Sequence, residues 1–195
     1  MDTREIENAL RGRLGPYIHY KGVFTSDHLP HVTYSYKPII IIANTLNSRV
    51  DVNIVGHWVA FYISFYPKQH LLFFDSYGFP PHFYSKYFSR WLEFYSSFQI
   101  QEFGQQIQPD DSQKCGLYVI QFTHFVSHYG LEKYKCFFKN KFSTRKLFLN
   151  DKLVTSYFFN RIVKKKNCSQ WKSVNKRDNN KRAVTFKECL MYKKR

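Results

Sequence analysis

Residues 57–66 read HWVAFYISFY and residues 70–77 read HLLFFDSY, with PKQ between them. Both runs are rich in aromatic and β-branched residues, which favour strands, and Pro67 begins a break that is typical of a turn. The pattern predicts a β-hairpin in which His57 opens the first strand and Asp75 closes the second. Antiparallel pairing places the start of one strand beside the end of the other, so His57 and Asp75 should be neighbours.

Regular structure is also expected on both sides of this hairpin. Apolar residues recur at helical spacing in some segments and form short compact runs in others. The expected elements are a helix over 2–13, a strand or helix start over 38–44, a helix over 83–98, a strand over 99–107 and a helix over 144–161. The fold class predicted is α+β, with a mainly antiparallel central sheet flanked by helices.

Cys115 stands between a polar loop, residues 108–113, and the apolar run GLYVIQFTHFVSH at 116–128. Because this run is apolar on most faces, it predicts a buried helix, and Gly130 offers a stop for it. A helix N-terminus lowers the pKa of a nearby thiol, and a thiolate is the better nucleophile. Cys115 is therefore the candidate nucleophile, with His57 as its base and Asp75 orienting the histidine.

An oxyanion hole needs hydrogen-bond donors where charge develops on the attacked carbonyl. The backbone N–H of Cys115 is one candidate. The side-chain amide of Gln108, on the loop that leads to the nucleophile, is the other. Gln105 and Gln106 lie close by, and only the spacing to Cys115 selects Gln108.

The composition fits a single folded domain over residues 1–195. Hydrophobic residues make up 44% of the 195 residues and aromatic residues 19%, which can fill a sizeable core. The longest aliphatic run, residues 39–43, is far shorter than a membrane span, and residues 1–10 lack the pattern of a signal peptide. We therefore expect no membrane association and an intracellular site of synthesis.

The formal net charge is +16, which argues for a polyanionic partner such as nucleic acid. Twelve of the 30 Lys and Arg residues lie in the basic C-terminal segment, residues 164–195, with only Asp178 and Glu188 as acids. The cluster Lys164, Lys165 and Lys166 is a candidate for sequence-independent contacts to DNA phosphates, which are sensitive to salt. A solvated extension is the alternative interpretation of such a charge run.

The remaining cysteines and histidines have simpler interpretations. Cys136, Cys168 and Cys189 form no CxxC pair with one another and are expected to be buried small hydrophobic residues. His124 and His128 lie four apart on one helix face, but no further metal ligands accompany them. The sequence predicts neither a metal site nor a small-molecule cofactor.

Three strings carry a family resemblance. GHWVAF at 56–61, LFFDSYGF at 72–79 and QPDDSQKCGLY at 108–118 resemble the adenovirus endopeptidase (adenain) family in order and near-family spacing. Residues 15–17 and 42–45 also resemble that family's N-terminal segments. The resemblance implies a papain-like fold of the adenain type, with His57, Asp75 and Cys115 as the triad and Gln108 in the oxyanion hole.

By the same resemblance the protein would be a monomeric viral maturation protease. Its substrates would be capsid or core precursor proteins of an adenovirus-like virus or a virus-like DNA transposon, cleaved through a thioester acyl-enzyme. DNA would be an activator. The protein would act in the host cell nucleus or at the site of virion assembly, and would be packaged in the virion.

Two departures from the family pattern bear on these expectations. Asp75 stands where mammalian adenovirus enzymes have Glu, and Asp is the residue of the related SUMO-protease group. No cysteine precedes Cys115, so an activating peptide, if one binds, is not expected to be disulfide-linked. A deconjugating isopeptidase for SUMO- or ubiquitin-like proteins is the first alternative function, and a DNA-binding structural protein with a vestigial protease site is the second.

Overall fold

The computed structural model describes residues 1–50, 54 and 56–164, and it contains five strands and a set of helices on both faces of their sheet. The strands are β1 (His19–Thr25), β2 (Ile39–Asn44), β3 (Trp58–Ser64), β4 (His70–Phe74) and β5 (Gln99–Glu102). The helices are α1 (Thr3–Leu10), α2 (Pro81–Tyr84), α3 (Lys86–Glu93), α4 (Cys115–Tyr129), α5 (Leu131–Lys141) and α6 (Leu147–Tyr157), followed by a π-helical segment, η1 (Phe158–Val163). The α+β class predicted from the sequence is confirmed.

The predicted hairpin is present and lies at the centre of the sheet. Strands β3 and β4 pair antiparallel, with Ala60 opposite Phe74 and Ser64 opposite His70. His57 immediately precedes β3 and Asp75 immediately follows β4. The two residues therefore lie at the same end of the paired strands, as the sequence predicted. The segment expected over 38–44 as a strand or helix start forms strand β2.

The sheet is mixed, so the expectation of a mainly antiparallel sheet was only half right. The strand order is β1-β2-β3-β4-β5, and β2-β3 and β3-β4 are antiparallel, whereas β1-β2 and β4-β5 are parallel. Parallel neighbours require a crossover connection. Residues 26–38 return the chain from β1 to β2, and α2 with α3 returns it from β4 to β5.

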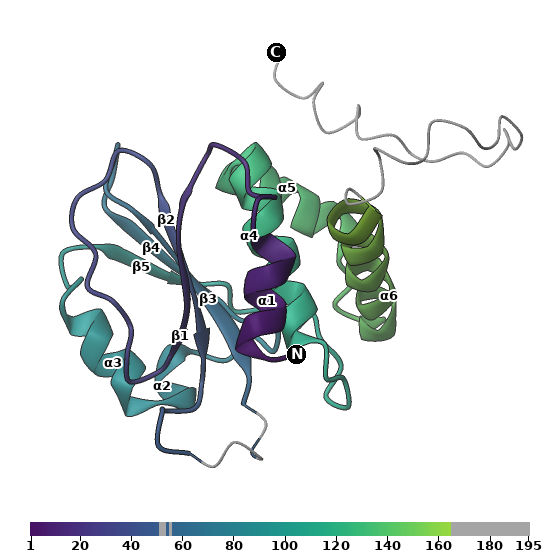
Figure 1. Ribbon diagram of the computed structural model, residues 1–195, viewed down its shortest axis with the longest axis horizontal. Helices are drawn as coiled ribbons and strands as arrows, with labels where there is room; N and C mark the ends of the chain where they lie inside the picture. Colours follow the sequence, from purple (N-terminus) through teal and green to yellow (C-terminus); the bar gives the residue numbers. More distant parts are fainter. Residues whose placement is uncertain (51–53, 55, 165–195) are drawn as a thin grey trace, which may run out of the picture.

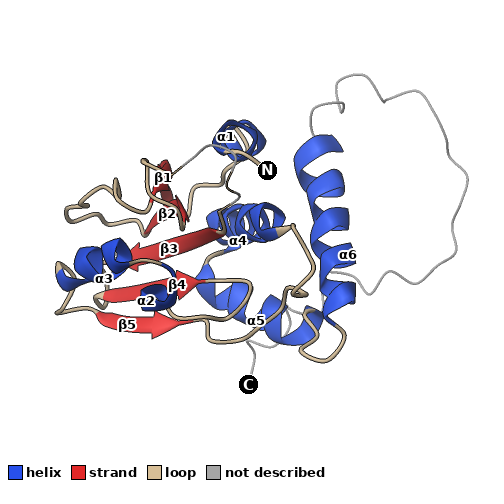
Figure 2. Ribbon diagram, turned by 90° about the horizontal axis from the view of Figure 1, so that it is seen from below, coloured by secondary structure: helices blue, strands red, loops and turns tan. Residues whose placement is uncertain are grey.

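Two helical layers enclose the sheet, with α1 and α4 on one face and α2 and α3 on the other (Figures 1 and 2). Side chains of β3 alternate between them: Trp58, Ala60 and Tyr62 pack in the core that includes α1 and α4. Val59, Phe61 and Ile63 pack in the core that includes α3. Because both faces of β3 are buried, its residues from Trp58 to Ile63 are all aromatic or aliphatic.

Several boundaries differ from the sequence-based expectations. The helix expected over 83–98 divides into α2 and α3 because Ser85 takes an extended conformation and its side chain accepts a hydrogen bond from the Tyr87 amide. The strand expected over 99–107 stops at Glu102. Helix α5 was not predicted, and the helix expected over 144–161 begins at Leu147 and changes to π-helical hydrogen bonding at Phe158.

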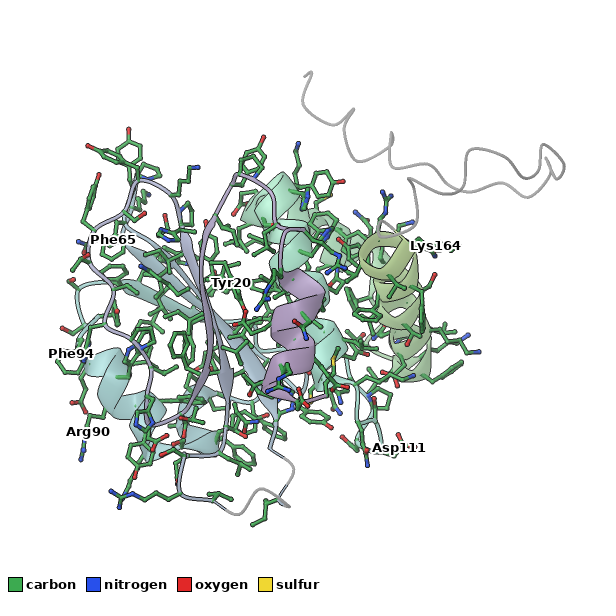
Figure 3. The ribbon with its side chains drawn as sticks, in the orientation of Figure 1. Tyr20, Phe65, Arg90, Phe94, Asp111 and Lys164 are labelled. Carbon is green, nitrogen blue, oxygen red and sulfur yellow. The ribbon has the colours of Figure 1, made fainter. Side chains whose placement is uncertain are left out.

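Cys136 corrects another expectation because it is exposed on α5 rather than buried. On an amphipathic helix its position faces away from buried Leu131, Tyr134 and Phe138. Cys168 and Cys189 lie outside the described residues, as do Lys165 and Lys166 of the basic cluster. Lys164 and Asp111 lie at opposite ends of the side of the molecule that carries α6 (Figure 3). Asp111 belongs to the loop leading to Cys115. None of the helices within the described ranges has the length and apolarity of a membrane span.

Candidate active site

The histidine and the carboxylate predicted to meet at one end of the hairpin are in direct contact. Nε2 of His57 lies 2.6 Å from Oδ1 of Asp75. The backbone of His57 is held by its own amide, which donates to Oγ1 of Thr45 at 2.9 Å. Because Nε2 faces the carboxylate, Nδ1 is the ring nitrogen that remains for a proton acceptor role toward the nucleophile.

Asp75 is almost completely buried, and its two oxygens accept four hydrogen bonds. Besides the His57 ring, Oδ1 accepts from the amide of Tyr77 at 3.1 Å. Oδ2 accepts from the amide of Phe79 at 2.8 Å and from the hydroxyl of Tyr84 at 2.9 Å. A carboxylate with this many fixed donors cannot rotate freely, so it holds the imidazole in one orientation.

Cys115 is the first residue of α4, as the sequence predicted. Its thiol interacts with the imidazole of His57 and with the backbone groups of Trp58 and Gly116. Burial alone would raise the pKa of the Cys115 thiol, but these partners outweigh it and hold that pKa below its ordinary value. Sulfur, imidazole and carboxylate thus form one connected chain from α4 to the hairpin.

The pKa of His57 is raised to about 9. Burial opposes this shift, and the hydrogen bonds and negative charges of Asp75 and Cys115 overcome it. The ring also lies between two tyrosines, with ring centroids 4.7 Å from Tyr77 and 5.3 Å from Tyr84. A raised histidine pKa beside a lowered cysteine pKa favours an imidazolium and thiolate pair.

Gln108 is close to the site, but its side chain is completely buried. Oε1 accepts from Oγ of Ser76 at 2.6 Å. Nε2 donates to the carbonyl of Ser112 at 2.7 Å and to the hydroxyl of Tyr77 at 3.1 Å. The amide predicted as an oxyanion donor therefore contacts Tyr77 rather than an open surface.

Two glycines allow the close approaches on which this arrangement depends. Gly78 has φ +79°, and a Cβ there would lie 2.7 Å from backbone atoms of Gln105 and Gln106. A side chain at this position would push the loop carrying Gln108 away from Tyr77. At Gly116 a Cβ would lie 2.8 Å from Sδ of Met1, whose carbonyl accepts from the indole N–H of Trp58 at 3.0 Å.

The loop before Cys115 is also tied to the helical layer. The Ile107 carbonyl accepts from the hydroxyl of Tyr118 at 3.1 Å and from the Asn150 side-chain amide at 2.8 Å. Nζ of Lys114 lies 3.5 Å from Oδ2 of Asp151 on α6. These contacts fix both ends of the segment that carries Gln108 and Cys115.

Sequence analysis did not single out Ser76, Tyr77 or Tyr84. For Tyr77 a signal existed, because an Asp side chain commonly accepts a hydrogen bond from the backbone amide two residues further on, as Asp75 does from Tyr77. For Tyr84 there was no comparable signal, because it reaches Asp75 from α2, nine residues further along the chain. Within residues 1–50, 54 and 56–164, no group of three or more His, Cys, Asp or Glu side chains is placed to hold a metal ion.

Comparisons with known proteins do not assign this chain to a family. No protein-family model matches the sequence, and no curated protein matches it. A solved structure that resembles the chain is the central domain of the uncharacterized Lpg1148 protein from Legionella pneumophila. That match has 16% identity and a TM-score of 0.42, and it covers 86% of this chain and 91% of that one. Likeness at this level transfers neither fold family nor function.

Proposed function

We propose that this chain is a cysteine endopeptidase with Cys115 as nucleophile, His57 as general base and acid, and Asp75 as the residue that orients His57. The observation that carries the proposal is the alignment of a carboxylate, an imidazole and a thiol. His57 contacts Asp75 at 2.6 Å through Nε2, and its imidazole lowers the pKa of the Cys115 thiol at the N-terminus of a buried helix. This is the arrangement that activates a thiol for attack on a carbonyl.

In the proposed reaction the Cys115 thiolate attacks the carbonyl carbon of the scissile peptide bond. The carbonyl π electrons move to oxygen, and the backbone N–H of Cys115, which as the first amide of α4 has no partner inside the helix, donates to that oxyanion. Collapse breaks the C–N bond, and His57 gives its proton to the leaving nitrogen. Water activated by His57 then hydrolyses the thioester and regenerates the thiol.

The substrate class of the proposal comes from the sequence resemblance. The adenain-type papain-like fold, viral capsid or core precursor substrates, a role in particle maturation and stimulation by DNA are all parts of the proposal that this resemblance supplies. The charge of +16 supports a polyanionic activator. We expect DNA stimulation to disappear at high salt, and a DNA response that is indifferent to salt would contradict phosphate contacts.

The proposal is tested with a fluorogenic peptide library and a thiol-directed peptide probe. Wild type should cleave members of the library, and the probe should label Cys115, as located by mass spectrometry. Cys115→Ala should lose both cleavage and that label. If Cys115 stays unlabelled and no peptide is cleaved, with or without DNA at low salt, the chain is not a protease and the DNA-binding structural role is favoured.

The isopeptidase alternative is separated by its substrate. A ubiquitin-like fusion joined through Gly-Gly is incubated beside a viral core precursor, with Cys115→Ala as the blank. Cleavage of the precursor supports the endopeptidase assignment. Cleavage of the fusion alone would overturn that substrate assignment while leaving the triad in place.

A further inference from the structure

Gln108 cannot meet a substrate in the arrangement observed. Its side chain has 0% exposure, and both hydrogens of its amide are used, one on the carbonyl of Ser112 and one on the hydroxyl of Tyr77. The orientation of the amide follows from its partners, because the Ser112 carbonyl can only accept and therefore requires Nε2. Direct donation to an oxyanion would break one of these bonds and uncover a buried group.

Tyr77 occupies the position between Gln108 and the catalytic pair. Its hydroxyl accepts from Nε2 of Gln108 at 3.1 Å, and its ring centroid lies 4.7 Å from that of His57. Unlike Gln108, Tyr77 is partly exposed. It is therefore the part of this hydrogen-bond chain that an incoming carbonyl can contact.

The hydroxyl proton of Tyr77 can be redirected without leaving an unpaired group. In the resting structure that proton is donated to the Ser112 carbonyl at 3.0 Å. The same carbonyl also accepts from Gln108 at 2.7 Å. If Tyr77 turns its proton to a substrate oxygen, Ser112 keeps the Gln108 donor, so the usual penalty for orphaning a buried acceptor is avoided.

We propose that the hydroxyl of Tyr77 is the side-chain donor of the oxyanion hole, and that Gln108 is a positioning residue that fixes Tyr77 from behind. The proposal rests on the endopeptidase function proposed above. As the Cys115 thiolate attacks, the carbonyl electrons move to oxygen, and the Tyr77 O–H donates a hydrogen bond to it together with the Cys115 amide. Tyr77 keeps its proton throughout, and the proton that reaches the leaving nitrogen comes from His57.

The electrostatics of Tyr77 suit a donor. Its pKa is raised, first by burial and then by the negative charge of Cys115 and of Asp110. A phenol with a raised pKa stays protonated at neutral pH, so the O–H remains available. The Gln108 amide donates into the phenol oxygen, which polarises the O–H bond toward its acceptor.

The decisive variant is Tyr77→Phe, which keeps the ring against His57 and removes only the hydroxyl. We expect kcat for a fluorogenic peptide cleaved by wild type to fall about 100-fold, the effect of losing one oxyanion donor, with KM nearly unchanged. Iodoacetamide alkylation of Cys115, which forms no oxyanion, should keep its wild-type rate. Tyr36→Phe removes the hydroxyl of an 82% exposed tyrosine and serves as the matched control, with kcat unchanged.

A double-mutant cycle with Gln108→Ala separates the two roles. If Gln108 acts through Tyr77, the double variant should be no slower than Tyr77→Phe alone. If Gln108 is the direct donor, Gln108→Ala carries the large loss and Tyr77→Phe keeps kcat within about threefold of wild type, which overturns the proposal. Thermal unfolding of each variant checks that it is folded.

Three further outcomes separate a failure of the Tyr77 role from a failure of the protease function. A parallel loss of alkylation and hydrolysis in Tyr77→Phe would show that Tyr77 supports the ion pair instead, and would overturn the oxyanion role. Wild type that neither cleaves peptide nor alkylates selectively at Cys115 would overturn the protease function itself. An active wild type with an unimpaired Tyr77→Phe overturns only the role of Tyr77.

Discussion

Two histidine environments in this molecule differ in their partners. His57 lies between a buried carboxylate and a thiol, and its pKa is raised to about 9. His124, also buried, pairs through Nδ1 with the hydroxyl of Tyr157 at 2.7 Å, and its ring lies 4.3 Å from that of His128. The hollow beside this second pair is lined by aromatic residues, the two histidines and Arg161, with no acid among its described lining residues. The partners, not the residue type, distinguish the histidine that we propose as the base.

Removing each histidine gives the largest expected contrast. His57→Ala removes the proposed base and the imidazole that lowers the pKa of the thiol, so hydrolysis of a fluorogenic peptide should fall by about 10⁴-fold or more. His128→Ala, on the second pair, should leave kcat within about twofold of wild type. Steady-state kinetics on both variants provide the measurement. A large loss in His128→Ala would mean that the second pair takes part in the reaction.

Asp75→Asn tests whether the carboxylate is what distinguishes the two environments. The amide keeps the size of the side chain but can present an N–H to Nε2 of His57, which favours the wrong tautomer. We expect kcat to fall by about 10³-fold with KM little changed, since comparable changes in triads cost up to about 10⁴. A loss below about tenfold in kinetic assays would contradict the orienting role.

The pH dependence of alkylation examines the ion pair directly. The pKa of Cys115 is lowered and that of His57 is raised to about 9, so thiolate and imidazolium coexist between the two values. Alkylation of wild-type Cys115 by iodoacetamide should therefore persist to lower pH than for a cysteine with the ordinary pKa, and hydrolysis should decline above about pH 9 as His57 loses its proton.

In His57→Ala the Cys115 thiol loses the imidazole, the first of the partners that lower its pKa. Burial still raises the pKa of that thiol, so a smaller fraction is thiolate at pH 7 and alkylation there should be slower than in wild type. Peptide mapping by mass spectrometry distinguishes Cys115 from exposed Cys136. Identical pH profiles in wild type and variant would refute the ion pair.

The sequence was informative where a local pattern sets the geometry. The hairpin places His57 beside Asp75 through strand alternation and one turn, and Gly116 after Cys115 marks the start of a helix. The pairing of His57 with Asp75 and the helix that begins at Cys115 both depend on short-range rules that hold in most folds. The parallel pairings of β1 and β5 depend instead on how long connections return, which periodicity does not encode.

The orientation of Gln108 could not be predicted for a related reason. Spacing places Gln108 near Cys115, but the direction of its amide is set by Ser76 and Tyr77, which come from the other side of the site. Tyr84 likewise reaches Asp75 from α2, a helix that the sequence did not separate from α3. Side-chain networks between separate elements are decided by tertiary packing, so they emerge only in the folded chain.

The smallest expected effects come from removing the same atom, a tyrosine hydroxyl, from each histidine environment. Tyr84→Phe removes one of four donors to Asp75 and keeps the ring against His57, so kcat should fall by about threefold to tenfold through a less fixed carboxylate. Tyr157→Phe removes the hydroxyl that bonds His124, which should lower the free energy of unfolding by about 1 kcal/mol and leave kcat unchanged.

Thermal unfolding and steady-state kinetics on this matched pair separate stability from chemistry. A loss of about 1 kcal/mol corresponds to a decrease in Tm of about 2–4 °C for a chain of this size. If Tyr157→Phe slowed hydrolysis as much as Tyr84→Phe does, the two environments would be coupled through α4, which carries both Cys115 and His124. If only Tyr84→Phe slows it, the reactive histidine is defined by the groups that touch its own carboxylate and thiol.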